Sequence, residues 1–108
     1  MNQSITVIRL TGELEIGRRG EVAAALVVSG SEPGILLDFA DVSYADSTSL
    51  AELIRFRDEA GKHDVPVAIV IGSKQFARLI QYAGLSHAFH IFENRADALM
   101  ELSRKRGA

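Results

Sequence analysis

Residues 34–53 read GILLDFADVSYADSTSLAEL, and this stretch decides which fold the chain adopts. Its first part, Ile35–Phe39, is a short apolar run after Pro33-Gly34, which is typical of a buried strand. A turn-rich connector follows over residues 40–45, and the apolar residues after it recur at helical spacing. The stretch therefore predicts a buried strand, a connector and a helix, in that order.

Four small polar residues, Asp46–Ser49 (DSTS), lie at the start of the predicted helix, directly before Leu50. Side-chain oxygens are favoured there because the first N–H groups of a helix have no partner within it. Ser49 followed by Glu52 also matches the capping box. One oxygen is enough to cap a helix, so the run leaves hydroxyl groups that capping does not use.

The length and composition indicate one domain, residues 1–108, large enough to bury a core. The chain has no cysteine, which excludes disulfides, thiolate chemistry and cysteine metal sites. Its longest apolar run, Val65–Ile71, is far shorter than the roughly 20 residues that span a bilayer. No signal-peptide pattern occurs at the N-terminus, so we expect a cytoplasmic protein without direct membrane insertion.

Charge and aromatic content exclude nucleic acid as the expected partner. The net charge is −2, so no overall positive field attracts phosphates. The chain has no Trp and few other aromatic residues, so it has no platform on which bases could stack.

The flanking segments alternate between strand and helix patterns. We expect strands at 4–10, 65–71 and 89–92, an extended or looping segment at 13–16, a break at 17–20, and helices at 22–27, 76–83 and from Asn94 onward. Ser73 is expected to cap the third helix and Gly84 to end it. Arg18 and Arg19 are interpreted as solvated loop residues. The alternation predicts an α/β fold, with a four- to five-stranded, mostly parallel sheet and about four helices.

The second helix is expected to run from about Ser47 to Gly61. Its apolar residues define a predicted buried face that comprises Leu50, Leu53, Ile54 and Ala60. Arg57 falls inside this face, where its stem can lie on apolar surface while its head reaches water. Phe56 falls at the edge of the face, so we expect it to be partly exposed.

The sequence contains no arrangement of residues that indicates an enzyme. It has no phosphate-binding loop, no GxGxxG after a strand and no GxSxG turn. His87 and His90 are three residues apart, and we favour two unrelated surface histidines over a shared metal. Loop and cap roles explain Asp38, Asp41 and Asp46. We therefore predict no catalytic residue, no cofactor and no metal.

Two interpretations of the DSTS run stay open. Composition alone favours a helix cap with additional polar residues. The alternative is a modification switch, because a phosphate is accepted well at a helix N-terminus and adds about −1.5 to −2 charges there. A partner packed on this surface would then face a buried, unpaired charge.

Two motifs make the chain resemble the STAS domain of anti-sigma factor antagonists. Residues 10–14 (LTGEL) are similar to the family's N-terminal strand and loop. Residues 38–50 (DFADVSYADSTSL) are similar to its strand, connector and Asp-Ser-Ser-Gly-Leu helix start. The order of the expected elements agrees with this family over nearly the whole chain.

The resemblance implies a phospho-switch protein. It would bind an anti-sigma factor that is itself a serine kinase, be released when that kinase phosphorylates it, and be reset by a serine phosphatase. The residue after the aspartate, Ser47, would be the modified one, with Thr48 as the second candidate. The implied partner-binding residues are Asp46, Ser47, Thr48, Ser49, Leu50 and Glu52.

The chain departs from the family pattern at three places. The glycine of the motif is Ser49, and Glu52 occupies a position that is often apolar. Only Met1–Gln3 precede the first strand, so an N-terminal edge strand is expected to be missing, and an uncovered edge favours a homodimer. The departures in the helix leave room for an alternative function, a STAS subunit docked on a transport ATPase such as a lipid-transport ABC complex.

Overall fold

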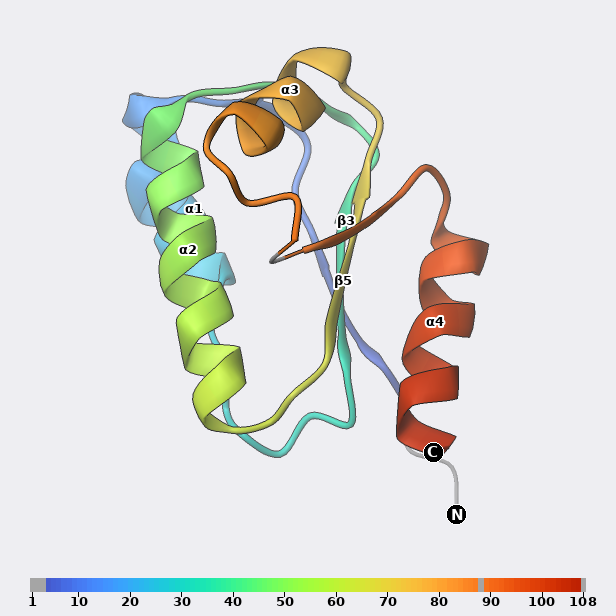
Figure 1. The fold of residues 1–108 in the computed structure, drawn as a ribbon. Helices are drawn as coiled ribbons and strands as arrows, with labels where there is room; N and C mark the ends of the chain where they lie inside the picture. Colours follow the sequence, from blue (N-terminus) through green and yellow to red (C-terminus); the bar gives the residue numbers. More distant parts are fainter. Residues whose placement is uncertain (1–3, 88, 108) are drawn as a thin grey trace.

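A four-stranded sheet lies between three helices on one face and a fourth helix on the other (Figure 1). This computed structural model describes residues 4–87 and 89–107, and of residues 105–107 it describes only the backbone. The elements are β1 (Thr6–Arg9), β2 (Gly12–Leu14), the 3₁₀ turn η1 (Ile16–Arg18), α1 (Arg19–Ala25), β3 (Ile35–Phe39), β4 (Val42–Ala45), α2 (Ser47–Lys62), β5 (Val67–Ile71), α3 (Lys74–Tyr82), β6 (His90–Phe92) and α4 (Arg95–Gly107). The predicted α/β fold is confirmed.

The main sheet has the strand order β1-β3-β5-β6, and all its pairs are parallel. All five residues of β3 are buried, as the apolar run predicted, because helices cover both faces of the central strands. On one face the core lies between the sheet and α1, α2 and α3. On the other face a smaller cluster joins Leu36 and Val70 to Ala98 and Leu102 of α4.

The connector after β3 contains a strand that the sequence did not predict. Residues 40–45 were expected to form turns only, but β4 pairs in parallel with β2 as a separate two-stranded sheet. The partner strand β2 lies about thirty residues earlier in the chain, so no local pattern marks the pairing. This small sheet leads the chain directly into α2.

Helix α1 begins earlier than predicted. The segment 17–20 was interpreted as a break, but it belongs to η1 and to the first turn of α1. Arg18 is not a solvated loop residue, because its guanidinium donates to the carbonyl oxygens of Thr11 and Glu13 at 2.6 and 2.9 Å. These bonds fix α1 to β2 and to the loop before it.

The buried face of α2 differs from the predicted one. Phe56, expected to be partly exposed, is fully buried, whereas Ile54 is 36% exposed. Arg57 lies outside the buried face and pairs with Asp58. The prediction was wrong because two inward positions of the helix are polar, Ser49 and Glu52, so the apolar residues alone indicated a face rotated around the helix.

The ends of α3 and α4 confirm the predicted caps. Ser73 accepts a hydrogen bond from the N–H of Phe76 at 3.1 Å. Gly84 adopts a positive φ of 74° just after α3, where glycine is favoured. Asn94 accepts from the N–H of Asp97 at 2.9 Å at the start of α4.

Strand β1 lies at one edge of the main sheet. Met1–Gln3, on which the prediction of a missing edge strand depends, lie outside the described residues. Within the described part of the chain, no helix combines the length and the apolar character that crossing a membrane requires.

Candidate functional site

Asp46 is the N-cap of α2. Its Oδ1 accepts hydrogen bonds from the N–H groups of Thr48 and Ser49, at 3.0 and 3.2 Å. The predicted capping box of Ser49 and Glu52 is therefore wrong, because Ser49 lies inside the first turn and Glu52 bonds elsewhere. The carboxylate accepts from two N–H groups that have no partner within the helix. Its negative charge also lies at the positive end of the helix dipole.

Ser47, the first residue of α2, is exposed, and Thr48 beside it is half-buried. Their side chains make no hydrogen bond within the described part of the chain that would occupy the hydroxyl groups. Ser47 is thus the most exposed hydroxyl residue of the DSTS run.

Ser49 faces the opposite way. It is 2% exposed, and its Oγ donates to the carbonyl oxygen of Leu14 at 2.9 Å. The same carbonyl accepts the N–H of Asp46 at 3.1 Å, so both ends of the helix start are bonded to the last residue of β2. Of the three hydroxyl residues, Ser49 is therefore the one whose side chain stabilises the fold.

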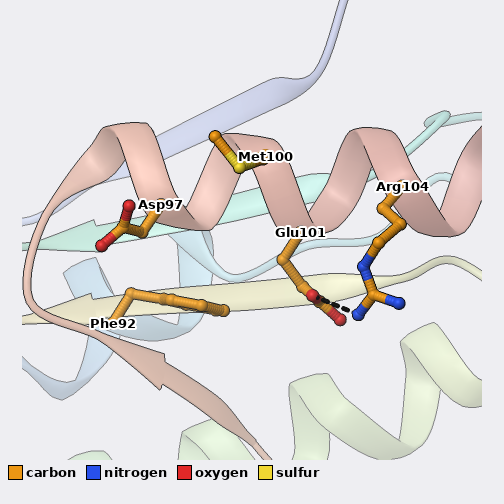
Figure 2. A pocket seen from close by; sticks show the side chains of 5 residues that line it. All are labelled: Phe92, Asp97, Met100, Glu101 and Arg104. Atoms are coloured by element: carbon orange, nitrogen blue, oxygen red, sulfur yellow. Dashed lines mark hydrogen bonds and ion pairs between the residues drawn. The ribbon is translucent and has the colours of Figure 1, made fainter.

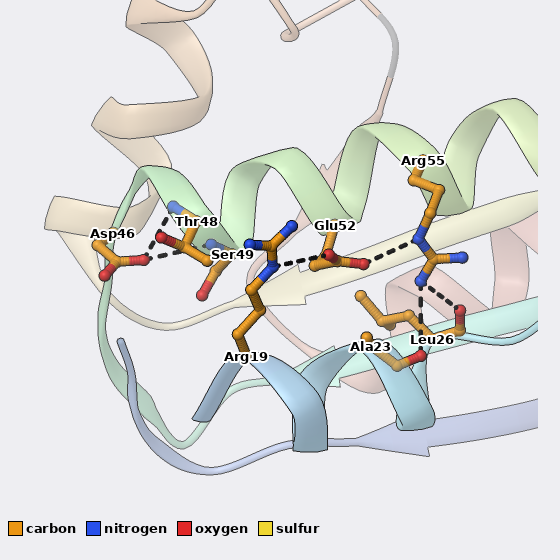
Figure 3. A network of polar contacts seen from close by, with 8 residues as sticks. All are labelled: Arg19, Ala23, Leu26, Asp46, Thr48, Ser49, Glu52 and Arg55. Atoms are coloured by element: carbon orange, nitrogen blue, oxygen red, sulfur yellow. Dashed lines mark hydrogen bonds and ion pairs between the residues drawn. The ribbon is translucent and has the colours of Figure 1, made fainter. Parts of the chain in front are cut away.

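Glu52 is also turned inward, one turn further along α2 (Figure 3). Its carboxylate accepts from Nε of Arg55 at 2.8 Å and lies 3.6 Å from Nε of Arg19. The hydrogen bond from Arg55 lowers the pKa of Glu52, and the nearby Arg19 adds to this effect, while partial burial opposes it. Arg55 also donates to the carbonyl oxygen of Leu26 at 3.1 Å, so this group of residues joins α2 to α1.

Sequence reasoning missed Arg55 and Arg19 as partners of Glu52. The three-residue spacing of Glu52 and Arg55 on one helix was a usable signal, because such residues are neighbours on the helix surface. Arg19 was not predictable, because its contact depends on how α1 packs against α2. Leu50, also named as a candidate, is only 8% exposed and belongs to the core.

Gln75 of α3 supports the chain just before the site. Its amide accepts the N–H of Ala45 at 3.0 Å and donates to the carbonyl oxygen of the same residue at 2.7 Å. The side chain thereby satisfies the outer edge of β4 as a neighbouring strand would. The residue before Asp46 is thus fixed from α3, in addition to the bonds from β2.

The three aspartates of the central stretch have separate structural roles. Asp38 is buried and bonds to Arg95 of α4 and to the N–H of Ala40, whereas the exposed Asp41 pairs with Arg9. Burial raises the pKa of Asp38, but the bonds from Arg95 and Ala40 and the charges of Arg95 and Arg9 together outweigh it and lower the pKa. The roles of Asp41 in a turn and of Asp46 as a helix cap agree with the prediction, whereas Asp38 was wrongly assigned, because it lies in β3 and pairs with α4.

No group of three or more His, Cys, Asp or Glu side chains in residues 4–87 and 89–107 is arranged to hold a metal ion. His87 and His90 are both exposed.

Three hollows lie on the surface of the described residues. The first, of about 260 Å³, is lined by α3, and the second, of about 170 Å³, lies between β6 and α4 (Figure 2). The third, of about 360 Å³, lies at the junction of β5 and α3. Residues 46–52 line none of these three hollows.

Comparison with known structures finds the same fold in two anti-sigma factor antagonists. The crystal structure of an anti-sigma factor antagonist from Mycobacterium paratuberculosis matches with a TM-score of 0.85 and 23% identity, covering 95% of this chain and 89% of that chain. The anti-sigma factor antagonist SpoIIAA in its unphosphorylated form matches with a TM-score of 0.72 and 22% identity, covering 99% and 92%. At these identities the likeness establishes the fold. No curated protein matches the sequence significantly.

The family assignment comes from the sequence and agrees with these structures. The sequence profile of the STAS domain matches residues 1–98. This match includes both sheets, the helices α1 to α3 and the start of α2 with its exposed serine. The chain belongs to the STAS domain family.

Proposed function

We propose that this protein is an anti-sigma factor antagonist that binds an anti-sigma serine kinase in the cytoplasm and is controlled by phosphorylation of Ser47. The observation that carries the proposal is the exposed hydroxyl of Ser47 at the first position of α2. The fold shared with two anti-sigma factor antagonists supports it. The protein acts by binding, without a catalytic residue or cofactor of its own.

The electrostatics of the helix start explain how phosphate would release the partner. Oδ1 of Asp46 already holds the N–H groups of Thr48 and Ser49, so these donors are not available to a phosphate on Ser47. The phosphate carries about −1.5 to −2 charges and would lie beside the Asp46 carboxylate. The two anions repel each other, so the phosphate points away from the fold into the docking surface. There it leaves a desolvated charge without a partner.

The predicted partner-binding residues divide by exposure. Ser47, with the partly exposed Asp46 and Thr48, presents the surface that the kinase contacts. Ser49, Leu50 and Glu52 are nearly buried and act from inside by holding that surface in place. A serine phosphatase would remove the phosphate and restore binding.

Incubation with the cognate kinase and ATP, followed by mass spectrometry, tests the proposal directly. We expect one phosphate on Ser47 and none on the Ser47→Ala variant. A Ser47→Asp variant is expected to bind the kinase at least tenfold more weakly than the unmodified protein, because one buried unpaired charge costs several kcal/mol.

Ser103→Ala provides a matched control, because Ser103 is also exposed but lies on α4, on the opposite face of the sheet. It should leave both phosphorylation and binding unchanged. Absence of phosphate from Ser47 and Thr48, together with unchanged binding by Ser47→Asp, would contradict the proposal.

The alternative, a docking subunit of a transport ATPase, remains a prediction that co-purification with ATPase subunits would support. This alternative was considered because Ser49 and Glu52 depart from the family pattern. Both side chains are turned inward, so neither alters the exposed surface on which the two functions would differ.

A further inference from the structure

Ser49 donates hydrogen bonds to two acceptors, one in its own helix cap and one in β2. Its N–H donates to Oδ1 of Asp46 at 3.2 Å, and its Oγ donates to the carbonyl oxygen of Leu14 at 2.9 Å. Each acceptor also takes a second donor, the N–H of Thr48 at Asp46 and the N–H of Asp46 at Leu14. Three of these four hydrogen bonds close a ring that joins the end of β2 to residues 46–49, and the fourth, from the N–H of Thr48, lies within it.

Ser47 lies inside this ring without taking part in it. The residues on either side of it, Asp46 and Thr48, are held by the bonds just described, whereas its own side chain is exposed. The direction of its Cα–Cβ bond is therefore set by the backbone bonds of its neighbours. The bond from Ser49 Oγ is the one bond of the ring in which a side chain, rather than a backbone N–H, is the donor.

We infer that Ser49 is a positioning residue, whose buried hydroxyl fixes the first turn of α2 on β2 and so presents Ser47 in the geometry that the kinase requires. The inference rests on the proposed function of Ser47. The family pattern has glycine at this position, which could not donate the bond to Leu14, so the device belongs to this chain. Ser49 itself is not a modification site, because it is 2% exposed and its oxygen is engaged.

The physical benefit is preorganisation. Phosphoryl transfer requires the attacking oxygen to lie in line with the leaving group of the nucleotide. A turn that is already ordered does not lose conformational freedom when the kinase binds, and a loosened turn does. The covalent step is the ordinary one: the Ser47 oxygen bonds to the γ-phosphorus of ATP, ADP leaves, and the hydroxyl proton passes to a base of the kinase.

The test compares Ser49→Ala with Ser49→Thr, which keeps a hydroxyl group, and with Asn94→Ala. The last variant removes a side-chain cap from α4 on the other face of the sheet. It loses one side-chain to backbone bond, as Ser49→Ala does, and in addition the bond from Nδ2 of Asn94 to Asp97. For each protein, amide hydrogen exchange at residues 47–49, thermal stability and kcat/KM for phosphorylation of Ser47 are measured. We expect Ser49→Ala to exchange faster at these amides by about tenfold, the change that loss of one hydrogen bond produces.

We expect Ser49→Ala to lower kcat/KM by roughly three- to tenfold, and Ser49→Thr to recover most of it. Asn94→Ala should lower the melting temperature while leaving kcat/KM and the exchange at 47–49 unchanged. Equal kinetic losses in Ser49→Ala and Asn94→Ala would overturn the inference, and so would wild-type exchange in Ser49→Ala or a phosphate found on Ser49. If the wild-type chain carries no phosphate on Ser47, the proposed function fails, and the exchange comparison alone decides whether Ser49 holds the turn.

Discussion

At the scale of single residues, Glu52 and Asp38 show how a carboxylate is accommodated in a largely buried position. Each is less than 10% exposed, and each has arginine partners, Arg55 and Arg19 for Glu52, and Arg95 and Arg9 for Asp38. The arginines stay partly in water, so the desolvation of each pair is incomplete. Both carboxylates join elements that are distant in the chain.

Removing the carboxylate of Glu52 should destabilise the protein moderately. Glu52→Ala leaves Arg55 still bonded to the carbonyl oxygen of Leu26 and partly hydrated, so we expect a loss of about 1–2 kcal/mol. Urea unfolding measures this loss. Glu52→Gln keeps the shape and one acceptor, and it should lose less. A loss above about 4 kcal/mol would indicate a buried, uncompensated charge, contrary to the geometry described.

The two lowered pKa values also predict how stability depends on pH. A carboxyl whose pKa is lower in the folded state adds stability above its unfolded pKa, about 3.9 for Asp and 4.3 for Glu. This stability is lost as the pH falls through the still lower folded pKa. We therefore expect unfolding free energy to fall steeply below about pH 4, and less steeply in the double variant Asp38→Asn, Glu52→Gln. Parallel slopes for the two proteins in urea titrations between pH 5 and 3 would contradict this.

At the scale of elements, the junction between β5 and α3 is defined by how closely two chain segments approach. A Cβ placed on Gly72 would lie 2.4 Å from the carbonyl oxygen of Ala40, in the turn after β3. The two strands β3 and β5 are paired in the sheet up to Phe39 and Ile71, so their following residues have little freedom to separate. Glycine is needed here for space.

Gly72→Ala should therefore destabilise the fold by about 1–3 kcal/mol, because the backbone of Ala40 must shift. Gly61→Ala is a suitable control, because a Cβ at Gly61, inside α2, meets nothing within 4 Å. Removing a helix glycine there should stabilise the protein by up to about 1 kcal/mol. Thermal unfolding of both variants checks the contrast. Equal effects of the two substitutions would show that close approach does not restrict Gly72.

At the scale of the whole molecule, the sheet separates two clusters of unequal size. The larger packs α1, α2 and α3 on the face that carries the start of α2, and the smaller packs α4 on the other. The ion pair of Asp38 with Arg95 adds to the attachment of α4. Because the α4 cluster contains few residues, α4 should open locally before the main core does.

The Leu102→Ala variant tests whether α4 opens before the main core. Leu102 is 1% exposed in the α4 cluster, and removing its buried carbons is expected to cost about 2–4 kcal/mol. Hydrogen exchange should rise in α4 and stay nearly unchanged in α2, and phosphorylation of Ser47 should continue at the wild-type rate. A comparable rise of exchange across α2 would mean that the two faces of the sheet unfold as one unit.

Local patterns in the sequence determined most of the elements. The mainly apolar run of β3, the cap and amphipathic spacing of α3 and the cap of α4 all follow from interactions over a few residues, and all are present. The strand β4, the partners of Glu52 and the true buried face of α2 were not predictable. Each depends on a segment that lies far away in the chain.

The sequence by itself determined that hydroxyl residues would gather at the start of α2, because a helix start needs small oxygen-bearing side chains. Only the tertiary structure decided which hydroxyl is available. Ser47 and Ser49 are two positions apart, so they point about 200° apart around the helix axis, and only one of them can face outward. The position of β2 settles the choice, because the carbonyl oxygen of Leu14 bonds Ser49 and leaves Ser47 exposed to solvent.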